Sequence, residues 1–511
     1  WRRPRLSEER EDGFSVSRAG GPARDGEDFS DFRRRPPRAE DHSSPEGEEP
    51  PFGYEDADAE PLPAGKPTGR LKRAHALSFA GLFLFTVVLY FRPYELFTSL
   101  AGVRSLAFWI AVATLLAFVP SQLSAEGGLT IRPREVNLVL LLALAGLLSI
   151  PFSINREEAF GTFVEFAKVV IMFVVMVNVV RTPARLKALM FLGLAVGVLV
   201  GAGAINDYRL GNLRLQGERI QGIVGGMFDN PNDMALHLAM MTPLALALML
   251  TSKGLLRKVL YAACALVMVL ADVVTFSRGG FLGLICAAGL FMWKVGRRHR
   301  FAVIAVSLLA VLLFMAFMPG TMGERFAAVF DPTGETSSAA ISAVSRRLIL
   351  YRSILVALRH PLFGIGMGTF HTVSIHEQVA HNGYTQVASE MGIPAMLIYV
   401  MLILSPLKRM RAVERETVGS REDSGWYYLA VGLQACLVAY MVSSFFGSVA
   451  YLYNLYYPVG YAVCLHRMYT ASREGKESAA AGGNSGGRAR DTFAPPDESY
   501  GEPSIMRGRT G

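Results

Sequence analysis

A histidine that precedes a short helical segment is the first candidate for chemistry in this sequence. His381 is followed by Asn382 and Gly383, and residues 384–391 have the pattern of a short helix. A histidine beside a helix N-terminus experiences the positive end of the helix dipole, which favours the neutral imidazole. Because a neutral imidazole can accept a proton, the sequence indicates a general base at His381.

Histidine also recurs at five-residue intervals, at His371, His376 and His381, which raises the question of a metal site. Metal-binding histidines on a helix are spaced three or four residues apart so that they face the same ion, and few carboxylates lie near this run. We therefore expect no metal and no cofactor at these histidines.

Arginine is the second residue type that could do chemistry, because the connections on one side of the predicted membrane contain arginine but no lysine. A planar guanidinium is suited to bidentate recognition of phosphate or carboxylate. Each of these arginines could instead pair with a lipid headgroup or with a loop carboxylate. They are Arg92, Arg104, Arg156, Arg209, Arg214, Arg219, Arg278, Arg325, Arg346, Arg347, Arg352 and Arg359.

Arg278 has the most informative position among them. The segment 275–280 joins two apolar runs with hardly any loop, so Arg278 must lie near the lipid interface. A charge at that depth is costly unless it is paired or faces water. We therefore take Arg278 as a candidate for binding an anion, with extension of its side chain to the lipid headgroups as the alternative.

These residues are positioned by a chain with the composition of a membrane protein. Of its 511 residues, 51% are hydrophobic and only 18% are charged, which is more apolar than a soluble domain can bury. A helix needs about 20 apolar residues to cross the hydrocarbon core. The sequence predicts an all-α, polytopic transmembrane helix bundle with spans at 75–91, 100–119, 136–154, 161–180, 186–205, 234–251, 259–276, 280–294, 301–319, 391–407, 426–446 and 449–466.

The basic residues between the spans indicate the orientation. Lys72 and Arg73 stand directly before the first span, and cytoplasmic connections are enriched in lysine and arginine. With both chain ends in the cytoplasm, every lysine in a connection falls on the cytoplasmic side. The net charge of +8 is explained by these basic residues between the spans. The sequence has no basic stripe interleaved with aromatic residues, so we do not expect nucleic-acid binding. The first residues, from Trp1, do not fit a cleavable signal peptide.

Composition divides the chain into five parts. Residues 1–70 and 467–511 are rich in Arg, Glu, Pro, Ser and Gly, so we predict disordered cytoplasmic tails there. Spans one to nine occupy residues 71–319, and spans ten to twelve occupy residues 391–466. Between them lies the loop 320–390, on the outer side of the membrane together with the shorter connection before span six. Long ordered loops in compact proteins are usually functional.

A helix is predicted within the long outer loop. Apolar residues recur at three- and four-residue intervals over 345–358, which favours a helix there. Ser345 is a suitable N-cap, and Pro361 ends the helix. Gly364 and Gly366 follow and predict a flexible turn whose backbone could approach a ligand closely.

Several segments together match one known pattern. They correspond to an R-x-x-G and N-P-N element, an S-R-G between adjacent spans, and the motifs R-x-x-x-W/Y, h-P-l-x-G-x-G, H-N-x-y and E-x-G. By these motifs, which are specific over residues 219–400, the chain resembles the O-antigen ligase and polymerase superfamily of membrane glycosyltransferases. Tyr351 stands where Trp is common. The matched residues are Arg219, Gly222, Asn230, Asn232, Ser277, Arg278, Gly279, Arg347, Tyr351, Gly364, Gly366, His381, Asn382 and Glu390.

The resemblance implies a transferase that takes a glycan from undecaprenyl pyrophosphate and joins it to an acceptor hydroxyl. It implies a periplasmic active site in the bacterial inner membrane and a role in lipopolysaccharide or exopolysaccharide biosynthesis. Arg278 and Arg347 would hold the pyrophosphate, and His381 would deprotonate the acceptor, without a metal or cofactor. The remaining matched residues would bind substrate: Arg219, Asn230, Asn232, Tyr351, Gly364, Gly366, Asn382 and Glu390.

The acceptor is left open by the sequence. It is lipid A-core for a ligase, a second lipid-linked glycan for a polymerase, and a protein for an oligosaccharyltransferase. A different class, a flippase for lipid-linked oligosaccharides, would also have about a dozen spans and internal charges. Repeated halves, which are common in transporters, are not evident in the sequence, and the charged residues cluster in one outer loop.

Overall fold

The structure is a computed structural model, and it describes residues 75–92, 106–126, 128, 130–212, 220, 222, 224, 228–296 and 338–488. All regular elements in this described part are helices, which confirms the predicted all-α class. The α-helices are α1 (Ala76–Phe91), α3 (Leu106–Glu126), α4 (Arg134–Ser149), α5 (Arg156–Val179), α6 (Pro183–Arg209), α7 (Pro231–Thr251), α8 (Leu255–Val274), α9 (Arg278–Val295), α12 (Ser338–Arg359), α13 (Gly383–Met391), α14 (Ile393–Thr417), α15 (Ser424–Ser443) and α16 (Tyr453–Arg488). The 3-10 helices are η2 (Ile150–Phe152), η5 (Phe370–Val373), η6 (Ile375–Glu377) and η7 (Ser444–Phe446).

Local sequence signals set where several helices begin. The side chains of Asn155 and Thr182 cap α5 and α6 by accepting from backbone N–H groups of the first turn. Proline occupies the first turn of α6 and α7, where its missing N–H costs no hydrogen bond. The predicted cap at Ser345 was wrong, because that residue lies inside α12. The alanine-containing segment that starts at Ser338 has good helix propensity and extends the helix upstream.

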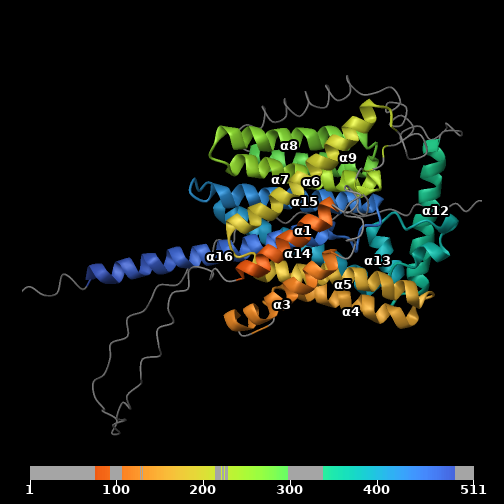
Figure 1. Cartoon of the computed structure of the whole chain (residues 1–511), viewed down its shortest axis with the longest axis horizontal. Coiled ribbons are helices and arrows are strands. Elements are labelled where there is room, and N and C mark those ends of the chain that lie inside the picture. Colours follow the sequence, from red (N-terminus) through yellow and green to blue (C-terminus); the bar gives the residue numbers. More distant parts are fainter. Residues whose placement is uncertain are drawn as a thin grey trace, which may run out of the picture. The chain divides into compact units, whose positions relative to one another are not determined.

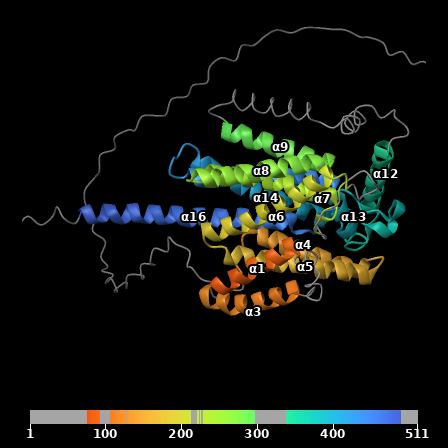
Figure 2. The same ribbon diagram turned by 45° about the horizontal axis from the view of Figure 1, so that its top comes forward.

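The helices α7 and α15 form the centre of the bundle. α7 packs against α8, α9 and α15, and α15 also packs against α9, α14 and α16. Figures 1 and 2 show these helices lying roughly parallel. Small residues allow the close approach: a Cβ built on Gly432 of α15 would lie 2.5 Å from the Cβ of Ala247 of α7. Such contacts between small residues are typical of helices that pack within membranes.

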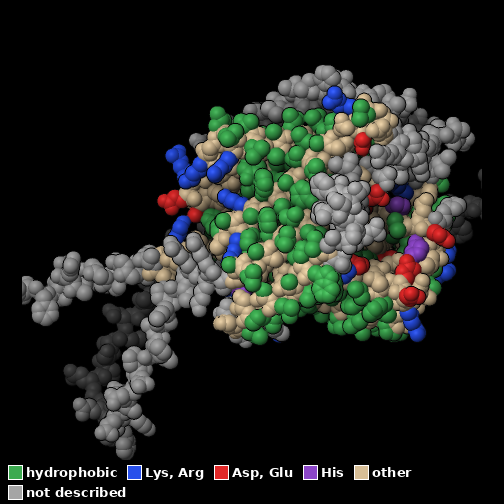
Figure 3. All heavy atoms as spheres, in the orientation of Figure 1, with side chains coloured by type: hydrophobic (Ala, Val, Ile, Leu, Met, Phe, Trp, Pro, Cys, Tyr) green, Lys and Arg blue, Asp and Glu red, His purple; other side chains and the backbone are tan. Residues whose placement is uncertain are grey.

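Eight of the described helices are long and apolar enough to cross a membrane, namely α3, α4 with η2, α5, α6, α7, α9, α14 and α15. Figure 3 shows hydrophobic side chains over the middle of one face and charged side chains gathered toward its two ends. This distribution is that of a multi-pass membrane protein. Every predicted span overlaps a helix except 301–319, which lies outside the described residues.

The last helix continues beyond its predicted span. α16 extends to Arg488, although the sequence predicted a disordered tail from residue 467. Its extension is attached to the end of α14, where Arg473 contacts Glu416 at 2.5 Å, and to the connection after α14, where Lys476 contacts Asp423 at 3.1 Å. These ion pairs stabilise a polar stretch of helix, and hydropathy alone does not reveal them. The assignment of this end to the cytoplasm stays a prediction.

The loop before α14 is built on two helices at one end of the bundle. α12 lies across the direction of the long helices and packs against α13 (Figure 1). The segment between them is anchored to the turn before α5, because the rings of Phe363 and Phe152 stack with centroids 4.4 Å apart. The backbone N–H of Ile154 also donates to the carbonyl oxygen of Ile365 over 3.0 Å. The loop is therefore an ordered layer over the ends of the spans.

Candidate functional site

His381 stands in the turn that leads into α13. Its backbone is left-handed (φ 51°), and its backbone N–H donates to the hydroxyl of Ser448 over 2.9 Å. The next residue, Asn382, caps α13, because its Oδ1 accepts from the N–H of Tyr384 at 2.9 Å and from that of Thr385 at 3.1 Å. The backbone of His381 is thus held beside a helix N-terminus, as the sequence predicted.

Arg278 is the first residue of α9 and lies in a junction of several segments. The N-cap residue Ser277 donates its hydroxyl to Oδ1 of Asn232, in the first turn of α7, over 3.0 Å. Gly279 packs directly on Phe446, since a Cβ at this glycine would lie 2.5 Å from the Cβ of Phe446. The S-R-G and N-P-N segments, far apart in the sequence, therefore meet at the same end of the bundle.

The turn η7 lies between these two parts of the site. Phe446 of this turn contacts Gly279, next to Arg278. On the side of α13, a Cβ built on Gly383 would lie 3.4 Å from the carbonyl oxygen of Ser444. His381 and Arg278 consequently flank one short turn. The sequence shows no motif for this turn, because the turn contacts the two parts of the site through a backbone carbonyl group and through the packing of Phe446.

The charge of Arg346, on α12, interacts with both Arg278 and His381. Burial lowers the pKa of Arg346, and the positive charge of Arg278 lowers it further. Burial also lowers the pKa of His381 to about 4, and the charge of Arg346 contributes to that shift. Both effects require Arg346 to lie near the two other side chains. Its neighbour Arg347 is exposed.

The positive charges of Arg278 and Arg346 lie near the neutral imidazole of His381. Among the ion pairs formed between described residues, none involves either arginine. Two nearby like charges in a partly buried site raise the free energy of the empty site, and an anion between them relieves this repulsion. The geometry is therefore suited to an anionic group next to a base.

The family model for O-antigen ligase matches residues 262–400, a segment that contains Arg278, Arg346 and His381. This match over residues 262–400 supports membership of the O-antigen ligase and polymerase superfamily. The matched family implies a membrane glycosyltransferase-like activity, with a lipid-linked glycan and an acceptor as its classes of substrate. No curated protein matches the chain significantly.

Glu390 stabilises the segment before α14, within the part matched by the O-antigen ligase model, through contacts with protein groups. Its buried carboxylate accepts from the N–H of Phe370 at 3.3 Å and from the hydroxyl of Tyr451 at 2.7 Å. Burial raises the pKa of Glu390 to about 7, and these hydrogen bonds act in the opposite direction. The residue joins α13 to η5 and to the turn before α16. Its predicted contact with substrate stays a prediction.

The glycine turn of the ligase domain is also packed against protein. Gly364 and Gly366 have φ values of 67° and 104°, which L-residues with side chains rarely adopt. A Cβ at Gly364 would lie 2.2 Å from the carbonyl carbon of Glu390, and one at Gly366 would lie 2.0 Å from Oγ of Ser153. The close backbone approach that the sequence predicted is thus an approach to α13 and to the turn before α5. No ligand is needed to explain either glycine.

The remaining predicted residues occupy different places. Asn230 caps α7, its side chain accepting from the N–H of Asn232 at 2.8 Å. Tyr351 is 64% exposed on α12, and Arg347 is exposed on the same helix. Arg219 lies outside the described residues. Arg346 and Ser448 were absent from the predicted site. For Arg346 the one sequence signal was its membership of the lysine-free set of arginines.

Proposed function

We propose that the protein is an O-antigen ligase-like glycosyltransferase that moves a glycan from undecaprenyl pyrophosphate to an acceptor hydroxyl. The observation that carries this proposal is that Arg278 and Arg346, which form no ion pair with another described residue, lie near the neutral imidazole of His381 around η7. The two guanidinium groups are suited to binding a pyrophosphate, and the imidazole is suited to accepting the proton of a hydroxyl group. Membership of the superfamily supports the same reaction class.

The first step of the proposed reaction is removal of the acceptor proton by His381. The lowered pKa of this residue means that its imidazole is neutral at ordinary pH and available as a base. The acceptor oxygen attacks the anomeric carbon of the donor as its O–H bond breaks. A general base of this kind contributes typically about 10²–10⁴-fold to the rate.

The second requirement is stabilisation of the leaving group. As the bond between the anomeric carbon and the pyrophosphate oxygen breaks, negative charge develops on that oxygen. Guanidinium groups already in place stabilise this charge without reorganisation, and the low-dielectric surroundings strengthen the interaction. In our proposal, the guanidinium groups of Arg278 and Arg346 stabilise this charge. Arg347 lies on the exposed side of α12 and is not assigned this role. A single displacement inverts the anomeric carbon.

We infer a bacterial inner-membrane protein with both termini in the cytoplasm and the site on the periplasmic side. The lysine placement supports this orientation, since lysine is confined to one side of the predicted topology. The proposed partners are an undecaprenyl-pyrophosphate-linked glycan and an acceptor that is lipid A-core, a glycan chain or a protein. The product would belong to lipopolysaccharide or exopolysaccharide biosynthesis.

An in vitro transfer assay with purified protein tests this function. A labelled lipid-linked glycan is offered separately with lipid A-core, with a second lipid-linked glycan and with a protein acceptor. We expect label to appear on one of these acceptors, and the labelled acceptor distinguishes a ligase from a polymerase or an oligosaccharyltransferase. Movement of intact donor across a bilayer without labelling of any acceptor would instead identify a flippase and overturn the proposal.

The pH dependence of transfer gives a second test. The value of kcat/KM reports ionisation in the free enzyme. Because the pKa of His381 is lowered from 6.5 to about 4, the neutral base persists as pH falls below 6.5, and kcat/KM should fall only as pH drops through about 4. A bound pyrophosphate raises the pKa of a neighbouring imidazole. The acid limb of kcat should therefore lie at higher pH than that of kcat/KM. Thermal unfolding at each pH serves as the control, and an acid limb of kcat/KM near 6.5 would contradict the assigned environment.

A further inference from the structure

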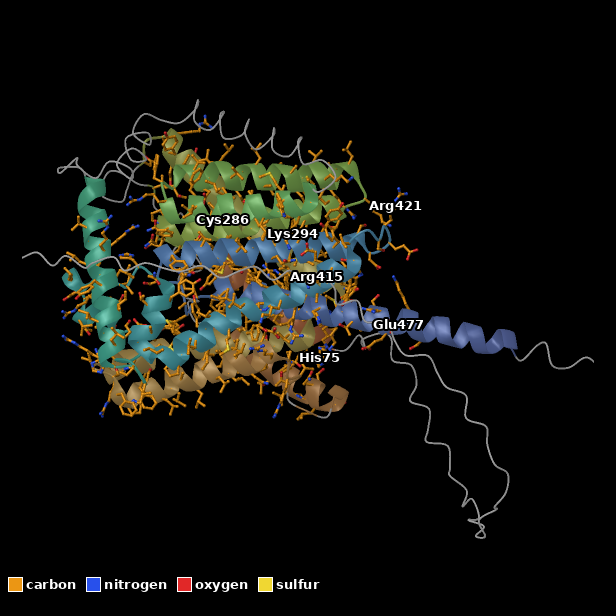
Figure 4. The ribbon with its side chains drawn as sticks, turned by 180° about the vertical axis from the view of Figure 1, so that it is seen from behind. His75, Cys286, Lys294, Arg415, Arg421 and Glu477 are labelled. Atoms are coloured by element: carbon orange, nitrogen blue, oxygen red, sulfur yellow. The ribbon has the colours of Figure 1, made fainter. Side chains whose placement is uncertain are left out.

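A basic pocket lies at the end of the bundle opposite to His381. It has a volume of about 230 Å³ and is formed where the last turns of α9 and α14 meet. Figure 4 labels two of its residues, Lys294 of α9 and Arg415 of α14. The residues that line the pocket are Lys294, Arg411, Glu414, Arg415 and Val418.

The inner wall of the pocket is a buried polar network. The ammonium group of Lys294 contacts the carboxylate of Glu414 and donates to Oε1 of Gln434 over 2.8 Å. Nε2 of Gln434 donates to the same carboxylate over 3.0 Å. Lysine and glutamate therefore neutralise one another, and the network is satisfied without a ligand. The net charge of the pocket comes from its rim.

The rim carries two arginines from one face of α14. Arg411 and Arg415 are four residues apart, so they project from the same side of the helix. Both are exposed, and none of the ion pairs formed between described residues includes either of them. The pocket thus presents two guanidinium groups above an inner wall in which the charges of lysine and glutamate cancel. This arrangement favours an anion with several acceptor oxygens.

We propose that this pocket binds the phosphate group of an anionic membrane lipid. The surroundings favour a lipid over a soluble phosphate as the source. Val418, which lines the pocket, is 49% exposed, and Trp293, next to Lys294, is 64% exposed. Exposed tryptophan is typical of the membrane–water interface, where headgroup phosphates lie. A lipid would place its phosphate between the arginines and its acyl chains along the apolar outer faces of α9 and α14.

This inference is independent of the proposed transferase activity. The pocket and His381 lie at opposite ends of the spans, and no residue belongs to both sites. Each basic residue near an anionic membrane surface contributes roughly 1 kcal/mol, so loss of Arg411 and Arg415 together should weaken binding about thirtyfold.

The experiment compares the full chain in phosphatidylcholine nanodiscs with and without phosphatidylglycerol. Retained phosphatidylglycerol is counted by native mass spectrometry, and thermal unfolding is followed in parallel. We expect wild type to retain the anionic lipid and to gain thermal stability from it. The double variant Arg411→Gln/Arg415→Gln should bind about thirtyfold more weakly, while its stability in phosphatidylcholine alone stays unchanged.

Arg421→Gln is the matched control. Arg421 is an exposed arginine on the connection after α14 but does not line the pocket (Figure 4), so this variant should bind as wild type does. Equal losses in the Arg421 variant and in the double variant would show a general charge effect and overturn the proposal. A stabilisation by inorganic phosphate equal to that by phosphatidylglycerol would overturn the assignment to a lipid.

Discussion

Replacement of His381 by alanine is expected to reduce glycan transfer by about 10²–10⁴-fold, the usual contribution of a general base. The fold should survive, because the hydrogen bond to Ser448 uses the backbone N–H of His381 and not its imidazole. Transfer of labelled glycan from the lipid-linked donor to the best acceptor measures the effect. Membrane insertion and thermal unfolding check that the variant is folded.

A second variant separates loss of the base from backbone strain. His381 has a φ of 51°, a left-handed conformation that asparagine tolerates better than alanine. His381→Asn should therefore fold at least as well as His381→Ala and be just as inactive.

His371→Ala provides a matched histidine control in the same loop. His371 is part of η5, and its imidazole lies 3.4 Å from the carboxylate of Glu158. Among the contacts between described residues, none joins it to His381. This variant should keep most of its activity. Near-normal transfer by a properly inserted His381→Asn protein would remove His381 from the mechanism.

Lysine substitution of the two site arginines is expected to produce the second large effect. Arg278→Lys and Arg346→Lys keep the positive charge but lose the planar guanidinium that binds two phosphate oxygens at once. Loss of one preorganised donor to a developing oxyanion costs about 10²–10³-fold in kcat. Each variant should fall by about that factor while its thermal stability changes little. The measurement is kcat under saturating lipid-linked donor.

Arg347→Lys is the decisive comparison. Arg347 is adjacent to Arg346 in the chain and matches the family motif, but it is exposed, whereas Arg346 affects the pKa of His381. We therefore expect kcat of Arg347→Lys to stay near that of wild type. If this variant loses activity and Arg346→Lys does not, the motif position identifies the pyrophosphate ligand and our assignment of Arg346 is incorrect.

The sequence by itself determined the class of the protein and the places where many helices start. Continuous apolar runs long enough to span a bilayer form helices, because lipid offers no water and a helix satisfies the backbone hydrogen bonds within the segment. Capping is equally local: Asn382 caps α13 through hydrogen bonds to residues two and three positions later. For this reason the placement of His381 beside a helix N-terminus was predictable.

Only the tertiary structure decided which side chains meet. Arg346 and Arg347 are adjacent, and successive residues of a helix point about 100° apart, so the direction in which α12 packs determines which one faces the site. Ser448 reaches His381 from a turn that is 67 residues away in the chain. Glu390 and Gly366 match a motif, yet their observed neighbours belong to the protein. Local periodicity and composition carry no information on such distant contacts, because they depend on how whole helices pack against one another.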